Sequence, residues 1–209
     1  MMLYRVVKRI MDFVIATVLW ILFSPLMLAI ALLIKFSDGG EVFVGTPVRC
    51  GLGGKEFFMY KFRTMVPNAH DMLVTDGEFV RSHKLENDFR VTRIGRVLRN
   101  TDLDELPQLI NVVLGQMSLV GPRPYYSSEL ERHFKLYPSD SRYMEDIFKV
   151  KPGITGVWQV SGRNSIPFRK RLVMESHFAK NPSILNEVYI LLKTPWVVIT
   201  RKGVEKRGF

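Results

Sequence analysis

Three carboxylates within four positions, Asp102, Asp104 and Glu105, form the acidic segment with the clearest chemical potential in this chain. Apolar residues recur at the helical period directly after them and predict a helix. We expect the carboxylates at the start of that helix, with Thr101 as the N-cap residue or with a cap as late as Asp104. Unpaired backbone N–H groups and the positive end of the helix dipole at such a place stabilise carboxylates and also attract phosphate.

Asp104 and Glu105 are expected to have different roles, because successive helical residues point about 100° apart. They therefore cannot face each other across a substrate as the acid and base of a glycosidase do. One can act as a nucleophile. The other can bind a hard cation such as Mg²⁺, which takes one or two carboxylates together with phosphate oxygens.

Basic residues surround this acidic segment. The chain has 30 Lys and Arg against 20 Asp and Glu, a net charge of +10, which implies an anionic partner such as a phosphorylated substrate, an anionic membrane surface or nucleic acid. Arg90, Arg93, Arg96 and Arg99 recur every three residues and form a stripe on a helix. This stripe is either a solvated face or part of a binding site.

Residues 35–209 indicate one mixed α/β domain that positions these groups. Short β-prone pieces within residues 42–62 flank the glycine-rich segment 50–55 and predict a β-hairpin. The glycine-rich segment matches neither phosphate-binding pattern, GxxxxGK[ST] or GxGxxG. Residues 66–90 are polar and irregular, which predicts a long loop of the functional kind.

Residues 1–34 indicate a membrane segment. Phe13 to Ile34 is an uncharged run of 22 residues, against the ~20 that a spanning helix needs. Ser24-Pro25 lies near its middle, where proline kinks or breaks a helix. The run is therefore either one kinked spanning helix or a re-entrant helix-break-helix with both ends on one side. Basic residues on both flanks favour the re-entrant form.

The C-terminal stretch from Ile184 to Ile199 is apolar but is interrupted by Glu187, Lys193 and Pro195. This pattern favours amphipathic helices in the membrane interface over a second span. The basic tail that follows, residues 201–209, suits anionic lipid.

Several short motifs recur in a fixed order along nearly the whole chain. They are Ser24-Pro25, YKFRTM at 60–65, LDELPQL at 103–109, Asn111-Val112, MSLVGPRP at 117–124, KPGITG at 151–156, Gln159 and Gly162-Arg163. In these motifs the chain resembles the small monotopic polyprenyl-phosphate phosphoglycosyltransferases of bacteria, the bacterial sugar transferase family.

The resemblance implies transfer of a sugar-1-phosphate from a UDP-sugar to a polyprenyl (undecaprenyl) phosphate with release of UMP, the first membrane step of bacterial glycoconjugate assembly. It implies that Asp104 is the nucleophile, that an aspartyl phospho-sugar forms, and that Glu105 and Asp104 hold Mg²⁺. It also implies a re-entrant segment broken at Ser24-Pro25, contact with membrane lipid, and a place on the cytoplasmic face of the bacterial inner (plasma) membrane. We expect no nucleic-acid partner, and homodimerisation is left open.

The substrate-binding residues that the resemblance implies are Lys61, Arg63, Arg93, Arg123, Gln159, Arg163 and Glu175. Cations are chemically required there, because a carboxylate that attacks a diphosphate meets anion–anion repulsion. At two places the chain departs from the family. Residues 47–51 read PVRCG where the family has Gln-x-Arg-x-Gly, and Glu175 and Phe178 stand where the family has Asp and Tyr. The role of Glu175 is therefore left open.

Two other functions are compatible with the composition. One is a non-catalytic, membrane-tethered basic protein that binds anionic lipid or nucleic acid, and the other is a phosphatase that acts on lipid diphosphates. No nucleic-acid-binding signature occurs in the sequence, and the acidic segment 102–105 would repel nucleic acid.

Overall fold

The computed structural model describes residues 2–44, 48–67, 69, 72 and 88–200 of the 209-residue chain. It is mostly helical, with two small two-stranded sheets, as the sequence predicts. The expected loop at 66–90 falls largely outside the described residues, and the basic tail at 201–209 lies wholly outside them. The predicted division of the chain at residue 34 stays a prediction.

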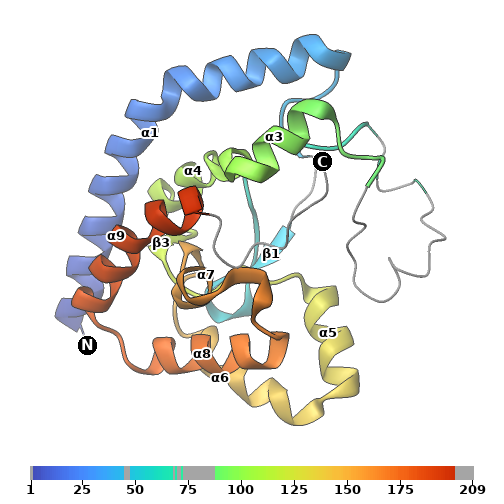
Figure 1. The fold of residues 1–209 in the computed structure, drawn as a ribbon. Coiled ribbons are helices and arrows are strands. Elements are labelled where there is room, and N and C mark those ends of the chain that lie inside the picture. The colour runs from blue at the N-terminus through green and yellow to red at the C-terminus, as the bar shows by residue number, and fades with distance from the viewer. Residues whose placement is uncertain (1, 45–47, 68, 70–71, 73–87, 201–209) are drawn as a thin grey trace.

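Helix α1, Met2–Asp38, is the long apolar N-terminal helix. Figure 1 shows it as two straight arms that meet at a bend in the middle of the helix. Pro25 lies inside it and has no N–H to donate to the carbonyl of Ile21. The Ser24 hydroxyl donates to that carbonyl oxygen at 2.8 Å instead. The Ser-Pro pair thus interrupts the backbone ladder and supplies the missing donor from a side chain.

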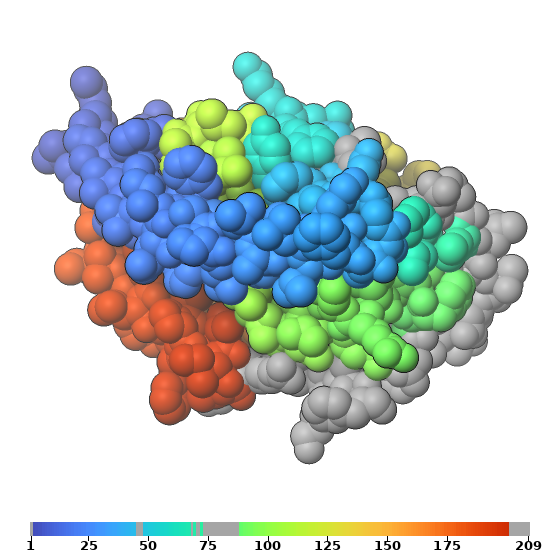
Figure 2. Space-filling view, turned by 90° about the horizontal axis from the view of Figure 1, so that it is seen from above, coloured from blue at the N-terminus to red at the C-terminus, as the bar shows by residue number. Residues whose placement is uncertain are grey.

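The length and composition of α1 would allow it to cross a membrane, with a mean hydropathy of 2.5 over its most apolar 18-residue window. Only 11% of that window is buried inside the molecule. Figure 2 shows α1 laid across one face of the globular part, with α9, Ile184–Thr200, beside it.

The N-terminal arm of α1 is joined to the globular part by buried polar contacts. Lys8 Nζ donates to Glu187 Oε2 at 2.7 Å and to the Val120 carbonyl at 3.1 Å. Asp12 accepts the backbone N–H of Leu119 at 3.1 Å. These contacts connect α1 to α9 and to strand β3, Ser118–Val120.

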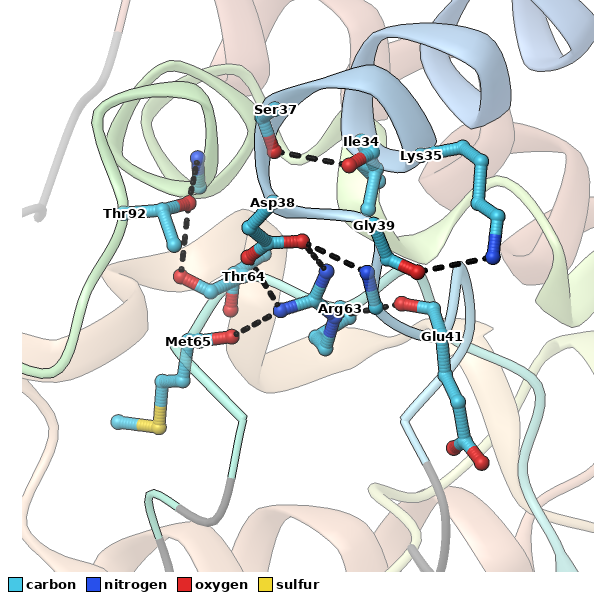
Figure 3. Close-up of polar contacts among 12 residues, drawn as sticks. Ile34, Lys35, Ser37, Asp38, Gly39, Glu41, Arg63, Thr64, Met65 and Thr92 are labelled. Carbon is cyan, nitrogen blue, oxygen red and sulfur yellow. Dashed lines mark hydrogen bonds and ion pairs between the residues drawn. The ribbon is translucent and has the colours of Figure 1, made fainter.

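The C-terminal end of α1 is joined to the same globular part (Figure 3). Arg63 Nη1 donates to Asp38 Oδ2 at 2.8 Å and to the Met65 carbonyl at 3.1 Å. Next to Arg63, the Thr64 carbonyl accepts a hydrogen bond from Thr92 Oγ1 at 3.5 Å, which connects this segment to the helix that follows Thr92. Both ends of α1 are therefore fixed to one body.

The predicted β-hairpin is confirmed. Strands β1, Val48–Cys50, and β2, Glu56–Phe58, pair antiparallel, with Val48 opposite Phe58. The turn contains a 3-10 segment, Leu52–Gly54, in which Gly53 has φ 67° and Gly54 φ 73°, a conformation that glycine adopts without steric cost.

The central elements are α3, Arg93–Thr101, a 3-10 turn at Leu103–Glu105, and α4, Gln108–Val113. The expected N-cap at Thr101 is wrong. Thr101 is the last residue of α3, and its hydroxyl donates back to the Val97 carbonyl at 2.8 Å. Asp102 then takes the left-handed conformation, φ 55°, which ends α3 and turns the chain toward the carboxylates.

The remaining elements pack around this centre (Figure 1). They are α5 Ser127–Leu136, α6 Arg142–Ile147, β4 Gly153–Thr155, α7 Val157–Ser161, α8 Phe168–Lys180 and α9, with 3-10 turns at Pro138–Ser141 and Arg163–Ser165. The largest apolar core cluster joins α1, α4, β3, α7, α8 and α9 through residues such as Ala16, Leu109 and Ile190. On its outer side α9 leaves Leu185, Leu192, Trp196 and Ile199 exposed.

Strands β3 and β4 pair parallel. The backbone directly after β3 also forms hydrogen bonds with β4. Gly121 N donates to the Thr155 carbonyl at 3.0 Å, and Gly153 N donates to the Pro122 carbonyl at 2.8 Å. A Cβ at Gly153 would lie 2.1 Å from Gly121 N, which leaves no room for a side chain. Glycine is therefore required for the close approach of the GPRP and KPGITG segments.

We predict that Gly153→Ala destabilises the protein by about 3 kcal/mol and lowers Tm by roughly 10 °C, because the clash is with backbone that cannot rotate away. Gly40→Ala is the matched control. Its Cβ would meet only the ends of two side chains, Arg63 at 2.8 Å and Asp38 at 3.2 Å, which can shift more easily than backbone, so the loss should be smaller. Thermal unfolding of the two purified variants measures the difference. Equal Tm values for the two variants would contradict the close-approach explanation.

Candidate active site

The segment that carries Lys61 is held against the carboxylates by two backbone hydrogen bonds. The N–H of Phe62 donates to the Asp104 carbonyl at 3.0 Å, and the N–H of Tyr60 donates to Asn111 Oδ1 at 2.9 Å. Asn111 also donates to the Phe58 carbonyl at 2.7 Å. The buried amide of Asn111 thus lays the YKFRTM segment along the 3-10 turn and α4.

Lys61 lies between the two carboxylates. Its Nζ is 2.9 Å from Asp104 Oδ2 and 3.1 Å from Glu105 Oε1. Asp104 is buried, with 2% of its surface exposed, whereas the Glu105 side chain is 39% exposed. A buried and an accessible carboxylate (the carboxylate pair) therefore share one ammonium group.

Burial raises the pKa of Asp104, and the adjacent Glu105 charge raises it as well, against the opposing effect of Lys61. Burial would also raise the pKa of Glu105, but the charges of Lys61, Arg123 and Arg163 outweigh burial and hold that pKa below its ordinary value. Burial disfavours the charged form of Lys61, yet the two carboxylates raise its pKa. Asp104 is thus the more basic carboxylate of the pair, and Glu105 the more acidic one.

Arg163 approaches the pair from the turn after α7. It forms an ion pair with Asp102, the residue that ends α3. Among the described residues, these two are the non-glycine positions with positive φ, 49° for Arg163 and 55° for Asp102. Two residues in a sparsely populated backbone conformation therefore hold each other beside the carboxylate pair.

Glu175 on α8 supports Arg123 from behind. One of its oxygens accepts the Arg123 backbone N–H at 2.8 Å and the other accepts the Tyr125 hydroxyl at 2.6 Å. The Arg123 side chain itself contacts Glu129 at 3.4 Å. Glu175 is fully buried, and burial raises its pKa to about 7, although both hydrogen bonds and the charge of Arg171 oppose this. Its contacts hold the GPRP segment in place.

Three predicted binding residues form no hydrogen bond or ion pair with the carboxylate pair in the described part of the structure. Arg63 is committed to Asp38 at the end of α1, and Arg93 is exposed at the start of α3. Gln159 lies on α7, with its Oε1 buried and without a hydrogen-bond partner. Substrate binding by these three residues stays a prediction.

One arginine near the pair was not singled out from the sequence. Arg99 on α3 donates to Thr64 Oγ1 at 2.8 Å, and its charge lowers the pKa of Asp104. Arg99 belongs to the arginine stripe predicted from the sequence, but the three-residue spacing does not indicate which arginine of the stripe faces the carboxylates. Arg90, by contrast, turns to Asp88 at 2.8 Å, and Arg96 is exposed.

Within the described part of the chain, no group of three or more His, Cys, Asp or Glu side chains gathers as a metal site. The carboxylate pair is therefore the candidate for a cation. Its oxygens converge on one positive charge, the Lys61 ammonium, and carboxylate oxygen is the ligand that Mg²⁺ prefers. Two carboxylates are also the number that Mg²⁺ takes when phosphate supplies further ligands.

The fold and the site define a mostly helical α/β protein in which a long apolar helix is attached to a body that carries a lysine-bound carboxylate pair. Residues 3–201 match the family model described as Bacterial sugar transferase. The chain belongs to this family.

Three relatives illustrate the range of similarity. The chain is 44% identical over 207 residues to an uncharacterized sugar transferase of Haemophilus influenzae, and 43% identical over 207 residues to the undecaprenyl-phosphate galactose phosphotransferase of Salmonella typhimurium. Each match covers 95% of this chain but only 42% of the relative, so the chain spans less than half of those proteins. The exopolysaccharide production protein ExoY of Rhizobium meliloti is 42% identical over 206 residues, with 93% of this chain and 86% of the relative covered.

The raised pKa of Glu175 predicts a pH-dependent stability. Its ordinary pKa is 4.5 and its folded value about 7, so the folded protein holds the proton more tightly than the unfolded chain. The stabilisation is complete below about pH 4.5 and is lost as the pH rises through 7, by about 3 kcal/mol in total. We expect the Tm of the wild type to fall more steeply between pH 5 and pH 8 than that of Glu175→Gln.

Glu131→Gln, at an exposed position of α5, is the control and should keep the slope of the wild type. Thermal unfolding at a series of pH values provides the measurement. The same slope in Glu175→Gln and the wild type would refute the assignment to Glu175.

Proposed function

We propose that this protein transfers a sugar-1-phosphate from a UDP-sugar to undecaprenyl phosphate and releases UMP. The observation that carries this proposal is the buried Asp104 carboxylate held 2.9 Å from Lys61, inside the motifs of a sugar transferase family. Two relatives, 43% and 39% identical over 95% of this chain, bear the names undecaprenyl-phosphate galactose phosphotransferase and UDP-glucose:undecaprenyl-phosphate glucose-1-phosphate transferase.

In the first half-reaction, an Asp104 oxygen attacks the phosphorus that bears the sugar. A bond forms between this carboxylate oxygen and the phosphorus. The bond from that phosphorus to the UMP phosphate oxygen breaks, and UMP leaves with the electron pair. In the second half-reaction, a phosphate oxygen of the lipid attacks the same phosphorus, and the carboxylate leaves unchanged. The raised pKa of Asp104 supports this role, because a more basic carboxylate is the better nucleophile once ionised.

Cations must offset the repulsion between the carboxylate and the diphosphate. Lys61 lies against both carboxylates, and Arg123 and Arg163 extend the positive field past Glu105. Asp104 and Glu105 would hold Mg²⁺, which supplies further neutralisation of the diphosphate charge when it is bound. Lys61 then turns from the carboxylates toward the transferred phosphate.

The apolar helix α1 would enter the membrane and return to the same side. Support comes from its two ends, because Lys8 binds Glu187 and Asp38 binds Arg63 in one globular body. A spanning helix would place these ends on opposite faces of the bilayer. The bend in α1 (Figure 1), a helix that contains Pro25, supports the same topology.

In this arrangement the globular part lies on the cytoplasmic face of the bacterial inner membrane, with the apolar outer side of α9 against lipid. This placement fits the first membrane step of glycoconjugate assembly, in which a nucleotide sugar in the cytoplasm meets a lipid acceptor. Homodimerisation stays a prediction.

Incubation with a UDP-sugar that carries a ³²P label at the sugar phosphate, with Mg²⁺ and without lipid, should leave label on the protein. Asp104→Asn should abolish the label and reduce UMP release in the full reaction by about three orders of magnitude or more, because it removes the nucleophile. The label should be acid-stable and hydroxylamine-sensitive, as an acyl phosphate is.

Glu131→Gln is the control, since Glu131 lies at an exposed position of α5, outside the 3-10 turn that carries the carboxylate pair. It should label like the wild type. Stoichiometric label on Asp104→Asn would rule out this nucleophile. Phosphate release from a lipid diphosphate, with no sugar transfer from UDP-sugars, would favour a phosphatase.

The topology of α1 can be measured with cysteine variants at its two ends, Leu3→Cys and Glu41→Cys, both at exposed positions. The native Cys50 is buried, so background labelling should be low. A re-entrant helix predicts that a membrane-impermeant maleimide labels neither variant in intact spheroplasts and labels both after lysis. Labelling of one end alone in intact spheroplasts would instead identify a spanning helix.

A further inference from the structure

Buried polar atoms without a hydrogen-bond partner gather around Arg123. In native proteins such atoms are rare, and a group of them calls for a physical explanation. Among the described residues, those near Arg123 are Arg49 Nε and Nη1, Glu129 Oε2, Trp158 Nε1 and Arg171 Nε.

Arg49 reaches this place from the hairpin. Strand β1 is hydrogen-bonded to the segment after Arg123, because the N–H of Cys50 donates to the Tyr125 carbonyl at 2.9 Å. The guanidinium carbon of Arg49 lies 3.0 Å from the centroid of the Tyr126 ring. The ring covers one face of the guanidinium, but its Nε and Nη1 have no acceptor.

Arg171 reaches the same place from α8. It is 8% exposed, and its guanidinium carbon lies 4.0 Å from the centroid of the Trp158 ring. The Arg123 guanidinium lies over the same Trp158 ring at 6.0 Å. Arg171 donates from Nη2 to the Ile166 carbonyl at 3.5 Å, while its Nε and the Trp158 Nε1 have no acceptor. Two arginines and an indole N–H thus converge.

The charge balance at this place is positive. Burial and, after it, the charge of Arg123 lower the pKa of Arg49 to about 9, so like charges lie close enough to repel. Burial and then Arg123 lower the pKa of Arg171 in the same way. Both remain protonated at neutral pH. Of the nearby carboxylates, Glu129 pairs with Arg123 and Glu175 is occupied by the Tyr125 hydroxyl and a backbone N–H.

We propose that Arg49, Arg123 and Arg171 (the arginine cluster), with the indole N–H of Trp158, form a binding site for a phosphate group of a substrate. A phosphate has several acceptor oxygens and matches the fork of a guanidinium, so it would satisfy the unpartnered donors and offset the repulsion between the arginines. This inference rests on the proposed function, whose two substrates, a nucleotide diphosphate and a lipid phosphate, both carry such a group.

The cluster is next to the carboxylate pair but distinct from it. The charge of Arg123 acts on Glu105, and the charge of Glu105 acts on Arg49.

The test is binding without turnover. Thermal unfolding of the wild type, Arg49→Gln and Arg171→Gln is followed while inorganic pyrophosphate, UMP or a short-chain polyprenyl phosphate in detergent is titrated. We expect each substitution to weaken pyrophosphate binding about tenfold or more, since each removes a charged hydrogen-bond donor. Arg142→Gln, at an exposed arginine of α6 that donates to the Tyr143 hydroxyl, should bind as the wild type does.

The two substrates are separated by the remaining titrations. A loss with UMP but not with polyprenyl phosphate assigns the site to the nucleotide, and the reverse loss assigns it to the lipid. Unchanged affinity for all three ligands in both variants overturns the proposal, as does the absence of any ligand-induced Tm shift in the wild type.

A structural role for the arginines predicts a different result. If the arginines mainly stabilise the fold, the ligand-free Tm should fall in the glutamine variants, and Arg49→Lys should restore it. A binding site predicts that the ligand-free Tm of Arg49→Gln is equal to or above that of the wild type, because an unpartnered buried charge is removed. A lower ligand-free Tm with unchanged ligand affinity counts against the proposal.

Failure of this inference and failure of the proposed function give different results. Arginine-dependent binding of pyrophosphate does not need Asp104, so it should persist in Asp104→Asn. If the protein transfers sugar phosphate but the arginine variants bind all three ligands as the wild type does, the proposed function holds and the arginine cluster is not a phosphate site.

Discussion

The contact on which the site depends is the Lys61 ammonium shared by Asp104 and Glu105. A buried carboxylate such as Asp104 is costly without a partner, and removal of one member of a buried ion pair typically costs about 3–5 kcal/mol. The backbone around Lys61 is correspondingly fixed. The N–H on one side of it binds the Asp104 carbonyl, and the N–H on the other side binds Asn111 on α4. The packing of the YKFRTM segment therefore also fixes the position of Lys61 between the two carboxylates.

The same helix that follows the carboxylate pair is joined to the apolar anchor. Arg9 on α1 donates to the carbonyls of Val112 and Val113 at 2.7 and 2.8 Å, at the C-terminal end of α4, where a cation is favourable. Helix α4 has six residues, so its two ends are only about 9 Å apart at ~1.5 Å per residue. In the proposed membrane topology, α1 would therefore hold the carboxylate pair at a fixed distance from the lipid surface, as the proposed reaction with a lipid phosphate requires.

Much of this organisation could be predicted from local patterns. The β-prone pieces around the glycine-rich segment predict the hairpin, and the uncharged run predicts the long apolar helix. The structure shows this helix as one element, Met2–Asp38, with Pro25 inside it. The predicted N-cap at Thr101 is wrong because α3 continues through Thr101, and the carboxylates lie in a separate 3-10 turn before α4. The break is a left-handed Asp102, held by Arg163 from 61 residues along the chain, and no local rule contains that contact. The partners of Glu175 escaped prediction for the same reason, since they come from the GPRP segment.

Local preferences and the fold conflict mainly at one place. Asp102 and Arg163 take a backbone conformation that non-glycine residues rarely adopt, and Glu175 is a buried carboxylate with a pKa of about 7. Arg49 and Arg171, near Trp158, each keep buried N–H groups that have no acceptor. Each feature costs free energy in the ligand-free protein, and sequences under selection for stability alone would remove them. All three adjoin the Arg123 segment or the carboxylate pair, where a phosphate would supply the missing acceptors. The cost is concentrated where binding of an anion can offset it, which is the physical reason for treating the arginine cluster and the carboxylate pair as neighbouring sites.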